Sequence, residues 1–220
     1  MGVNISRFVE IEVVNKTQNI ALKDPRTHFF SGHILLDPKP SVPPGSSSSC
    51  KFTNKSVFWG CNGVLAYEVD SFTLAIYFSN PIDYNQFSVE MGLELSLDKV
   101  HRKDLEAAYD RLVRISKGSA NSSMFPCVIL KENQDKVQLS HGPVTVTATM
   151  ARGRSAAIRV EVEEQKESGE EAEAEKPRGA EREKPWDVKG DRSKRSEKET
   201  GPRETLQEVL QGLKNSPGNA

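Results

Sequence analysis

Short segments in which apolar and polar residues alternate recur from residue 8 to residue 162. In the first of them, Val9, Ile11 and Val13 fall on one side of an extended chain, and the glutamates between them fall on the other. The same alternation is found in the last segment, residues 156–162. A period of two residues is typical of a strand with one buried face, so the pattern predicts a chain built mainly from β-strands.

Further segments rich in β-branched and aromatic residues lie between these two and are separated by turn residues. They occupy residues 24–34, 51–53, 57–59, 63–69, 73–78, 87–97, 128–130, 137–139 and 144–150. Residues 63–69 and 73–78 are almost wholly apolar, which predicts a buried hairpin. Residues 38–49 are rich in Pro, Gly and Ser, and we expect a loop there because a central strand does not tolerate proline.

One region departs from the β pattern. Between residues 98 and 115 apolar residues recur at helical spacing, namely Leu105, Ala108, Tyr109 and Leu112. We expect Ser96 or Asp98 to cap this helix at its N-terminus. Many short strands, turn signals between them and a single helix predict an all-β fold, a β-sandwich with one or two flanking helices.

The chain changes character at about residue 165. Residues 161–220 hold 28 charged residues and one aromatic residue, Trp186. Such a segment buries too little apolar surface to offset the entropy that it would lose on ordering. The sequence therefore predicts a β-sandwich domain at residues 1–164, followed by a disordered, mixed-charge tail at residues 165–220.

A short amphipathic helix is predicted inside the tail at residues 205–214. Thr205 is a suitable N-cap, and Glu208 stands at the capping-box position. The apolar residues at helical spacing are Leu206, Val209, Leu210 and Leu213. Because so short a helix is marginally stable alone, it would form mainly by docking on the body or on a protein partner. The alternative is that these residues have no docking role.

Several functional classes lack support in the sequence. No apolar run approaches the ~20 residues of a membrane-spanning helix, and the first residues do not read as a signal peptide, so we expect cytoplasmic synthesis. A net charge of −1 argues against binding nucleic acid through bulk electrostatics. The histidines are widely spaced and no catalytic or nucleotide-binding motif occurs, so we expect a protein that is not an enzyme and holds no metal and no cofactor. Cys61 is the one conceivable nucleophile, but a cysteine without an evident base is more often structural.

A more specific signal lies in the middle of the chain. The run GVLAY at residues 63–67 is followed by TLAIYFSNPIDYN at residues 73–85. Weaker matches are the FSG run at residues 30–32, the proline-rich loop that leads to Gly45, and the closing strand at 156–162. With these motifs, residues 7–164 resemble the actinoporin family, the pore-forming cytolysins of sea anemones, and still more the vertebrate actinoporin-like relatives of these toxins.

This resemblance implies a β-sandwich that recognises the phosphocholine headgroups of membrane lipids, above all sphingomyelin. The family's toxins are secreted, and they assemble on target membranes into a cation-conducting pore. Carried over by position, the implied headgroup-binding residues are Ser31, Ser79, Pro81, Tyr109 and Phe87, the last where the family has a tyrosine, with Tyr84 as a neighbour of the pocket. Aromatic faces attract a quaternary ammonium, and serine hydroxyls can donate hydrogen bonds to phosphate.

The sequence also departs from the family pattern. Positions where the family has aromatic residues are occupied by Ile82, Gln86, Glu90, Met91, Leu105 and Asp110. A carboxylate beside the site would attract choline and repel phosphate, so we expect a weakened or redirected headgroup affinity. Only residues 1–7 precede the first strand, too few for the toxins' membrane-crossing segment, so we expect no toxin-type pore.

Three functional hypotheses follow from these patterns. The first is an actinoporin-like module that binds phosphocholine-bearing lipid at a membrane surface, with pore formation lost or dependent on a partner. The second is a soluble protein-interaction scaffold that acts through its C-terminal tail. The third is a lectin-like protein with a carbohydrate in the same pocket.

Overall fold

In the computed structural model, the described part of the chain comprises residues 6–56, 58–119 and 125–165. The strands are β1 Phe8–Asn15, β2 Leu22–Ser31, β3 His33–Leu36, β4 Ser41–Val42, β5 Ser47–Thr53, β6 Cys61–Glu68, β7 Thr73–Asn80, β8 Glu90–Ser96, β9 Cys127–Leu130, β10 Lys136–His141, β11 Val144–Ala151 and β12 Ser155–Glu164. The helices are the 3-10 helix η1, Val100–Arg102, and the α-helix α1, Leu105–Ser116.

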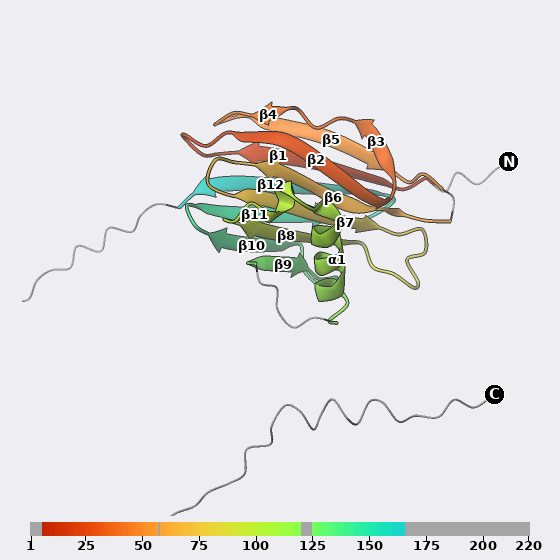
Figure 1. The fold of residues 1–220 in the computed structure, drawn as a ribbon. Helices are drawn as coiled ribbons and strands as arrows, with labels where there is room; N and C mark the ends of the chain where they lie inside the picture. Colours follow the sequence, from red (N-terminus) through yellow and green to blue (C-terminus); the bar gives the residue numbers. More distant parts are fainter. Residues whose placement is uncertain (1–5, 57, 120–124, 166–220) are drawn as a thin grey trace, which may run out of the picture. The chain divides into compact units, whose positions relative to one another are not determined.

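The strands form two six-stranded sheets that pack face to face (Figure 1). We call the sheet with the order β4-β2-β6-β7-β8-β9 the helix-bearing sheet and the sheet with the order β10-β11-β12-β1-β5-β3 the open sheet. All neighbouring strands are antiparallel except β1 and β12, which are parallel. The all-β sandwich predicted from the sequence is confirmed, with one α-helix beside it.

Alternation along the strands decides which side chains fill the space between the sheets. In β1, Ile11 and Val13 are fully buried, whereas Glu10 on the opposite face is exposed. In β12, Ile158 and Val160 point into the same core and Arg159 points outward, as the sequence predicts. The hairpin of β6 and β7 is also confirmed, and its residues are almost all buried because α1 covers one face and the open sheet covers the other.

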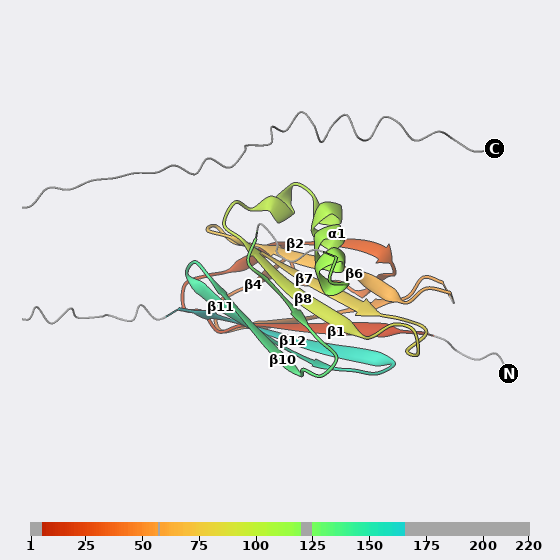
Figure 2. The ribbon, with the colours of Figure 1, turned by 90° about the horizontal axis from the view of Figure 1, so that it is seen from below.

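The helix α1 lies on the outer face of the helix-bearing sheet, on the side away from β1 and β12 (Figure 2). Its apolar side buries Ala108, Tyr109 and Leu112, and the last two belong to a small second core on β6 and β7. The expected caps were wrong, because the N-cap is Asp104, whose carboxylate accepts a hydrogen bond from the Ala107 amide at 2.9 Å. The residues before Asp104 form η1 instead of the first turn of the helix.

A buried ionic network fastens α1 and η1 to the sheet. The carboxylate of Glu94 in β8 is fully buried; it lies 2.8 Å from His101 Nε2 and accepts a 2.6 Å hydrogen bond from Arg111 of α1. The other ring nitrogen of His101 lies 2.8 Å from the Thr73 hydroxyl. Burial alone would raise the pKa of Glu94, but the hydrogen bonds from His101 and Arg111 hold that pKa below its ordinary value.

Three local predictions were wrong. Ser47–Ser49 belong to β5, which lies between β1 and β3, because the four prolines of the expected loop all precede it. The short strand expected at 24–34 is the longer β2 followed by β3, and a register shift between Lys23 and Arg26 accommodates Pro25. Phe58 and Trp59 lie in a turn and a bend, not in an extended piece.

The predicted tail begins at Gln165, which is the last described residue. The rest of the tail, residues 166–220 with the predicted helix at 205–214, lies outside the described residues. Within the described part of the chain, no helix is both long enough and apolar enough to cross a membrane.

Candidate functional site

Four polar residues form a row across the helix-bearing sheet. Ser31 of β2 pairs in register with Asn62 of β6, Asn62 with Ser79 of β7, and Ser79 with Glu90 of β8. Residues that pair directly across strands project from the same face, which here is the face that α1 covers further along. The Ser79 hydroxyl donates a 2.8 Å hydrogen bond to Asn62 Oδ1. We call these four residues the polar row.

A run of aromatic rings lies beside the polar row. Tyr109 of α1 packs edge-on against Tyr77 of β7, with ring centroids 5.8 Å apart, and face to face with Phe30 of β2, with centroids 6.0 Å apart. Phe30 in turn contacts Trp59 edge to face at 5.9 Å. The Tyr109 side chain is 8% exposed, whereas Phe30 is 60% exposed and Trp59 is 58% exposed. The run therefore leads from the helix–sheet core to the surface, and we call it the aromatic run.

A β-bulge at the end of β2 makes this arrangement. The register passes from Phe29 opposite Gly63 to Ser31 opposite Asn62, so that Phe30 is the extra residue. Phe29 packs into the main core against Phe52, while Phe30 turns to the Tyr109 ring. Gly32 then has φ +145°, and a Cβ there would lie 3.0 Å from the Thr53 carbonyl oxygen.

An open groove of about 640 Å³ borders the exposed end of the aromatic run. Phe30 and Trp59 supply its aromatic surface, Ser31 and Ser56 its hydroxyls, and Lys55 its ammonium group. The Ser56 hydroxyl oxygen accepts a 3.2 Å hydrogen bond from the Phe58 amide. This bond stabilises the turn in which Trp59 is exposed. A groove of this size accommodates a small ligand or a lipid headgroup.

Two loops form this end of the sandwich, residues 54–60 and residues 81–89. They touch at Gly60, where a Cβ would lie 2.2 Å from the Asn80 carbonyl oxygen and 2.6 Å from the Pro81 Cα, so no side chain fits between them. Both loops present exposed rings, Phe58 at 82% and Phe87 at 60%. We call the end that carries Phe30, Phe58, Trp59 and Phe87 the aromatic end.

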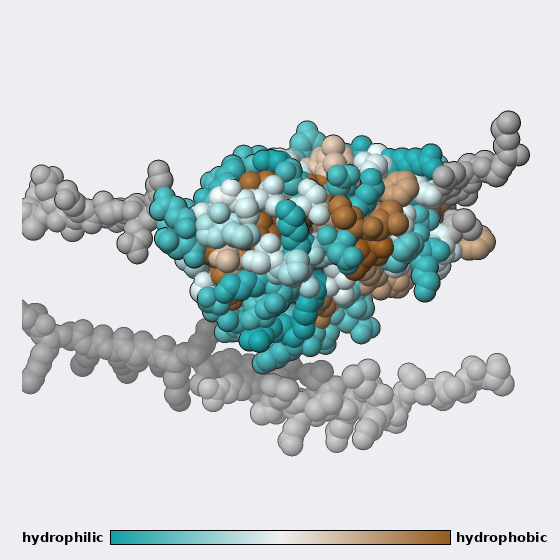
Figure 3. All heavy atoms as spheres, turned by 90° about the horizontal axis from the view of Figure 1, so that it is seen from above, coloured by the Kyte–Doolittle hydropathy of each residue, from teal (hydrophilic) through white to brown (hydrophobic). Residues whose placement is uncertain are grey.

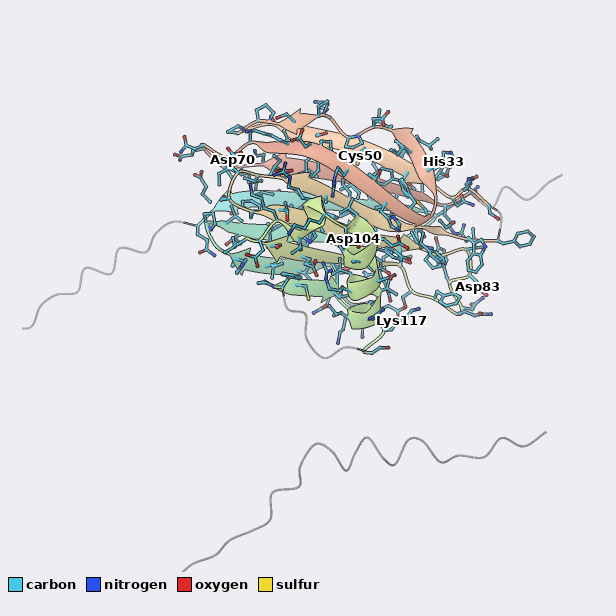
Figure 4. All side chains as sticks on the ribbon, viewed as in Figure 1. His33, Cys50, Asp70, Asp83, Asp104 and Lys117 are labelled. Atoms are coloured by element: carbon cyan, nitrogen blue, oxygen red, sulfur yellow. The ribbon has the colours of Figure 1, made fainter. Side chains whose placement is uncertain are left out.

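The views of the side chains agree with this description. In Figure 4, His33 and Asp83 lie at one end of the sandwich, whereas Asp70, in the β6–β7 turn, lies at the other. Figure 3 shows hydrophobic side chains gathered toward one end of the face that it presents, with hydrophilic side chains over most of the remainder. Monomeric proteins seldom expose several large rings together, so the aromatic end is a candidate binding surface.

The residues implied by the resemblance occupy different parts of this end. Ser31, Ser79 and Tyr109 lie together on the helix side of the sheet, in the polar row and in the aromatic run. Pro81 is buried under the contact with Gly60, and Phe87 projects from the loop.

Tyr84 is held by the scaffold. Its hydroxyl bonds to Asn80 Oδ1 at 3.0 Å and to the Gly153 carbonyl oxygen at 2.9 Å. The guanidinium carbon of Arg7 lies over its ring, 4.5 Å from the centroid, while Arg7 donates to the carbonyl oxygens of Pro81 and Ile82. One face of the Tyr84 ring thus already has a cation, and its polar group already has partners.

Two carboxylates influence the helix side of the site. Glu90 accepts a hydrogen bond from the Tyr77 hydroxyl at 3.2 Å and one from the Ser116 hydroxyl at 2.6 Å. Burial first, and then the negative charges of Asp110 and Glu90, raise the pKa of Tyr109 to about 12. Tyr109 is therefore a neutral phenol at any physiological pH, and its surroundings favour a cation.

Sequence reasoning missed Phe30 as a contact of Tyr109, and it missed Asn62, Lys55 and Trp59 altogether. A visible signal was the adjacent pair Phe58-Trp59 in a segment of otherwise small and polar residues, because two aromatic residues in a turn are seldom both buried. The bulge that turns Phe30 toward α1 has no such signal, since register depends on the partner strand.

The described residues show no group of three or more His, Cys, Asp or Glu side chains able to hold a metal ion. Cys61 is fully buried in β6, and burial raises the pKa of its thiol to about 12. At neutral pH this thiol carries its proton and has no route to solvent, so the local chemistry does not favour nucleophilic attack.

Comparison with solved structures found chains that are similar to this one over part of its length. The lipid-binding protein Nakanori matches with a TM-score of 0.54 at 15% identity, over 71% of this chain and 70% of that protein. A lectin from Xerocomus chrysenteron matches with a TM-score of 0.44 at 10% identity, over 71% of this chain and 99% of the lectin. IP-1A from Alcaligenes faecalis matches with a TM-score of 0.36 at 13% identity, over 73% of this chain and 92% of that protein.

No protein-family model matches the sequence, and no curated protein matches it. At 15% identity, the match to Nakanori establishes a shared β-sandwich fold and nothing finer. The β-sandwich fold that the resemblance implies is thus supported, and membership of the actinoporin family stays a prediction.

Proposed function

We propose that this protein is a non-enzymatic module that binds lipid bilayers through its aromatic end. The observation that carries the proposal is the aromatic run, which rises from buried Tyr109 through Phe30 to Trp59 beside the serine hydroxyls of the polar row. Exposed aromatic rings are favourable at the interface between water and hydrocarbon, where an apolar face and a polar edge are both solvated. The shared fold with a lipid-binding protein supports the same function.

The headgroup that fits this arrangement is phosphocholine, as in sphingomyelin. A quaternary ammonium would lie against the rings of Tyr109 and Phe30, where the negative charges of Glu90 and Asp110 favour a cation. The Ser31 hydroxyl would donate to the phosphate, and the Ser79 hydroxyl would do so by turning its one proton away from Asn62 Oδ1. Glu90 is already tied to Tyr77 and Ser116 on the far side of Ser79, which moderates the repulsion that the sequence alone led us to expect.

Co-sedimentation with vesicles tests this proposal. Vesicles of phosphatidylcholine, with and without sphingomyelin, are mixed with the full chain, and the bound fraction is measured. We expect binding that sphingomyelin strengthens and that Phe30→Ala and Trp59→Ala together abolish. The control is Leu97→Ala, which removes an exposed apolar side chain next to β8 at the opposite end of the sheet. Absence of binding to every vesicle would refute the proposal.

The same vesicles, loaded with a dye, test the separate expectation that no toxin-type pore forms. Crosslinking of the bound protein tests whether copies assemble on the membrane, as the family's toxins do. The alternative function, a scaffold acting through Leu206, Val209, Leu210 and Leu213, concerns residues outside the described part and stays a prediction; deletion of residues 200–220 would abolish partner capture and leave lipid binding intact.

A further inference from the structure

The charge of the groove at Lys55 is not explained by phosphocholine binding at Tyr109. Lys55 is exposed, lines the groove, and forms no ion pair with any described residue. Ser56, whose hydroxyl oxygen accepts a hydrogen bond from the Phe58 amide, and Trp59 line the same groove. The groove thus combines a cation, a hydroxyl donor and aromatic faces.

The groove and the carboxylates lie at opposite ends of the polar row. From Ser31 to Glu90 the row crosses three strand spacings, a backbone separation of about 14 Å. A phosphocholine group is much shorter, because a single ethylene unit links its nitrogen to a phosphate oxygen. A headgroup whose ammonium lies near Glu90 is therefore displaced from the Ser31 end of the row, and the two ends of the row suit groups of opposite charge.

No charged side chain other than Lys55 lines the groove among the described residues. Arg7 approaches the same loop through its amide, which donates to Asn54 Oδ1 at 2.8 Å, and its guanidinium donates only to carbonyl oxygens among the described residues. In the neighbouring loop, the Asp83 carboxylate accepts the Asn85 amide at 2.9 Å and stabilises its own turn. Lys55 is therefore the charged side chain that an anion entering the groove would meet.

We propose that this groove is a second headgroup site, which takes the phosphate or carboxylate of an anionic glycerophospholipid. The Lys55 ammonium and the Ser56 hydroxyl bind the anionic oxygens, and the Trp59 ring covers the glycerol backbone and the start of the acyl chains. The inference rests on the proposed membrane-binding function, because it needs the aromatic end to face a bilayer. It adds a selectivity: the protein prefers membranes that contain anionic lipid beside choline lipid.

Vesicles of three compositions test the site: phosphatidylcholine alone, phosphatidylcholine with sphingomyelin, and phosphatidylcholine with phosphatidylserine as a minor component. The full chain is compared with Lys55→Gln, with Lys55→Arg, which keeps the charge, and with Lys136→Gln. Lys136 is an exposed lysine at the start of β10, at the opposite edge of the open sheet from β3, and it forms no ion pair with any described residue. Thermal unfolding of each variant verifies that the fold is unchanged.

We expect phosphatidylserine to strengthen binding of the wild-type protein, and Lys55→Gln to lower that affinity about fivefold. Lys55→Arg and Lys136→Gln should behave like the wild type, and Lys55→Gln should keep its response to sphingomyelin. An equal response to phosphatidylserine in Lys55→Gln and wild type would overturn the site. So would sphingomyelin-dependent binding without any response to phosphatidylserine, which leaves the proposed function intact. Failure to bind any vesicle would overturn both.

Discussion

Phe30 and Tyr109 lie face to face, with ring centroids 6.0 Å apart and an angle of 6° between the ring planes. The two rings come from different layers, since Tyr109 belongs to α1 and Phe30 to the bulge at the end of β2. Tyr109 is nearly buried, whereas Phe30 is 60% exposed. The stack therefore extends the helix–sheet contact into a surface on which a cationic headgroup can lie.

Removal of the exposed ring should affect binding more than folding. We expect Phe30→Ala to weaken binding to sphingomyelin-containing vesicles about tenfold, because a cation–π contact and its buried apolar area are both lost. The thermal midpoint should change little, since most of the ring is already solvated. Leu97→Ala serves as the control; an equal loss of binding in that variant would show that the effect is not specific to the aromatic run.

The Ser79 hydroxyl donates to Asn62 Oδ1 in the free protein, and it is predicted to turn its proton to the lipid phosphate on binding. Ser79→Ala should lower affinity for sphingomyelin vesicles about fivefold, which corresponds to one lost hydrogen bond. Ser140→Ala is a matched control, because Ser140 forms a 2.8 Å hydroxyl bond to Thr145 on the open sheet, whereas β7 belongs to the helix-bearing sheet. Unchanged vesicle binding in Ser79→Ala would remove Ser79 from the site.

Substitution of Tyr84 distinguishes a structural role of this residue from a role in ligand binding. Its hydroxyl bonds to Asn80 and Gly153, so Tyr84→Phe should lower the free energy of unfolding by about 1 to 2 kcal/mol, measured in urea. Binding per folded molecule should stay unchanged, because Arg7 already occupies one face of the ring. Weaker vesicle binding at unchanged stability would instead assign Tyr84 to the headgroup pocket.

Because Glu94 is buried and ionised, we expect the free energy of unfolding to fall in acid. Its pKa is lower in the folded state than its ordinary value of 4.5, so the ionised carboxylate stabilises the fold above that pH, and this stabilisation is lost as the pH falls through the folded-state pKa. Glu94→Gln should cost about 3 kcal/mol at neutral pH, since His101 and Arg111 lose their anion. Urea unfolding between pH 3 and 7 measures both effects; the variant should show a flatter pH profile, and equal profiles would contradict this account.

Thiol labelling tests the surroundings of the cysteines. Burial raises the pKa of Cys50 and of Cys61 to about 12, so both should react negligibly with a thiol reagent at pH 8 in the folded protein. Cys127 is only partly buried and should react first. All three should react in urea. Rapid labelling of Cys61 in the folded protein would revive its interpretation as a nucleophile.

The β-sandwich could be predicted because the sequence patterns that indicate its strands each lie within a short segment of the chain. Alternation in β1 and β12, the apolar hairpin of β6 and β7, and the helical spacing of Ala108 and Leu112 each show within one short window which face is buried. The start of α1 was misplaced because Ser96, Asp98 and Asp104 are all suitable caps, and η1, held by the contact of His101 with Glu94, decides among them.

The site was only partly predictable, because it depends on register between strands that are distant in sequence. The resemblance identified Ser31, Ser79 and Tyr109 as candidate site residues, and all three lie on the helix side of the helix-bearing sheet. It could not show that Asn62 joins the two serines in one row, or that a bulge turns Phe30 onto Tyr109. Both facts follow from pairing of β2 with β6, which no single segment encodes.

Fluorescence of Trp59 tests the central claim most directly. Trp59 and Trp186 are the two tryptophans of the chain, so Trp186→Phe leaves Trp59 as the single reporter at the aromatic end. We predict that vesicles of phosphatidylcholine and sphingomyelin shift its emission to shorter wavelength and protect it from an aqueous quencher, as an indole does on entering the bilayer interface. Co-sedimentation with those vesicles without any change in Trp59 emission or quenching would show that another surface meets the membrane, and would contradict the account.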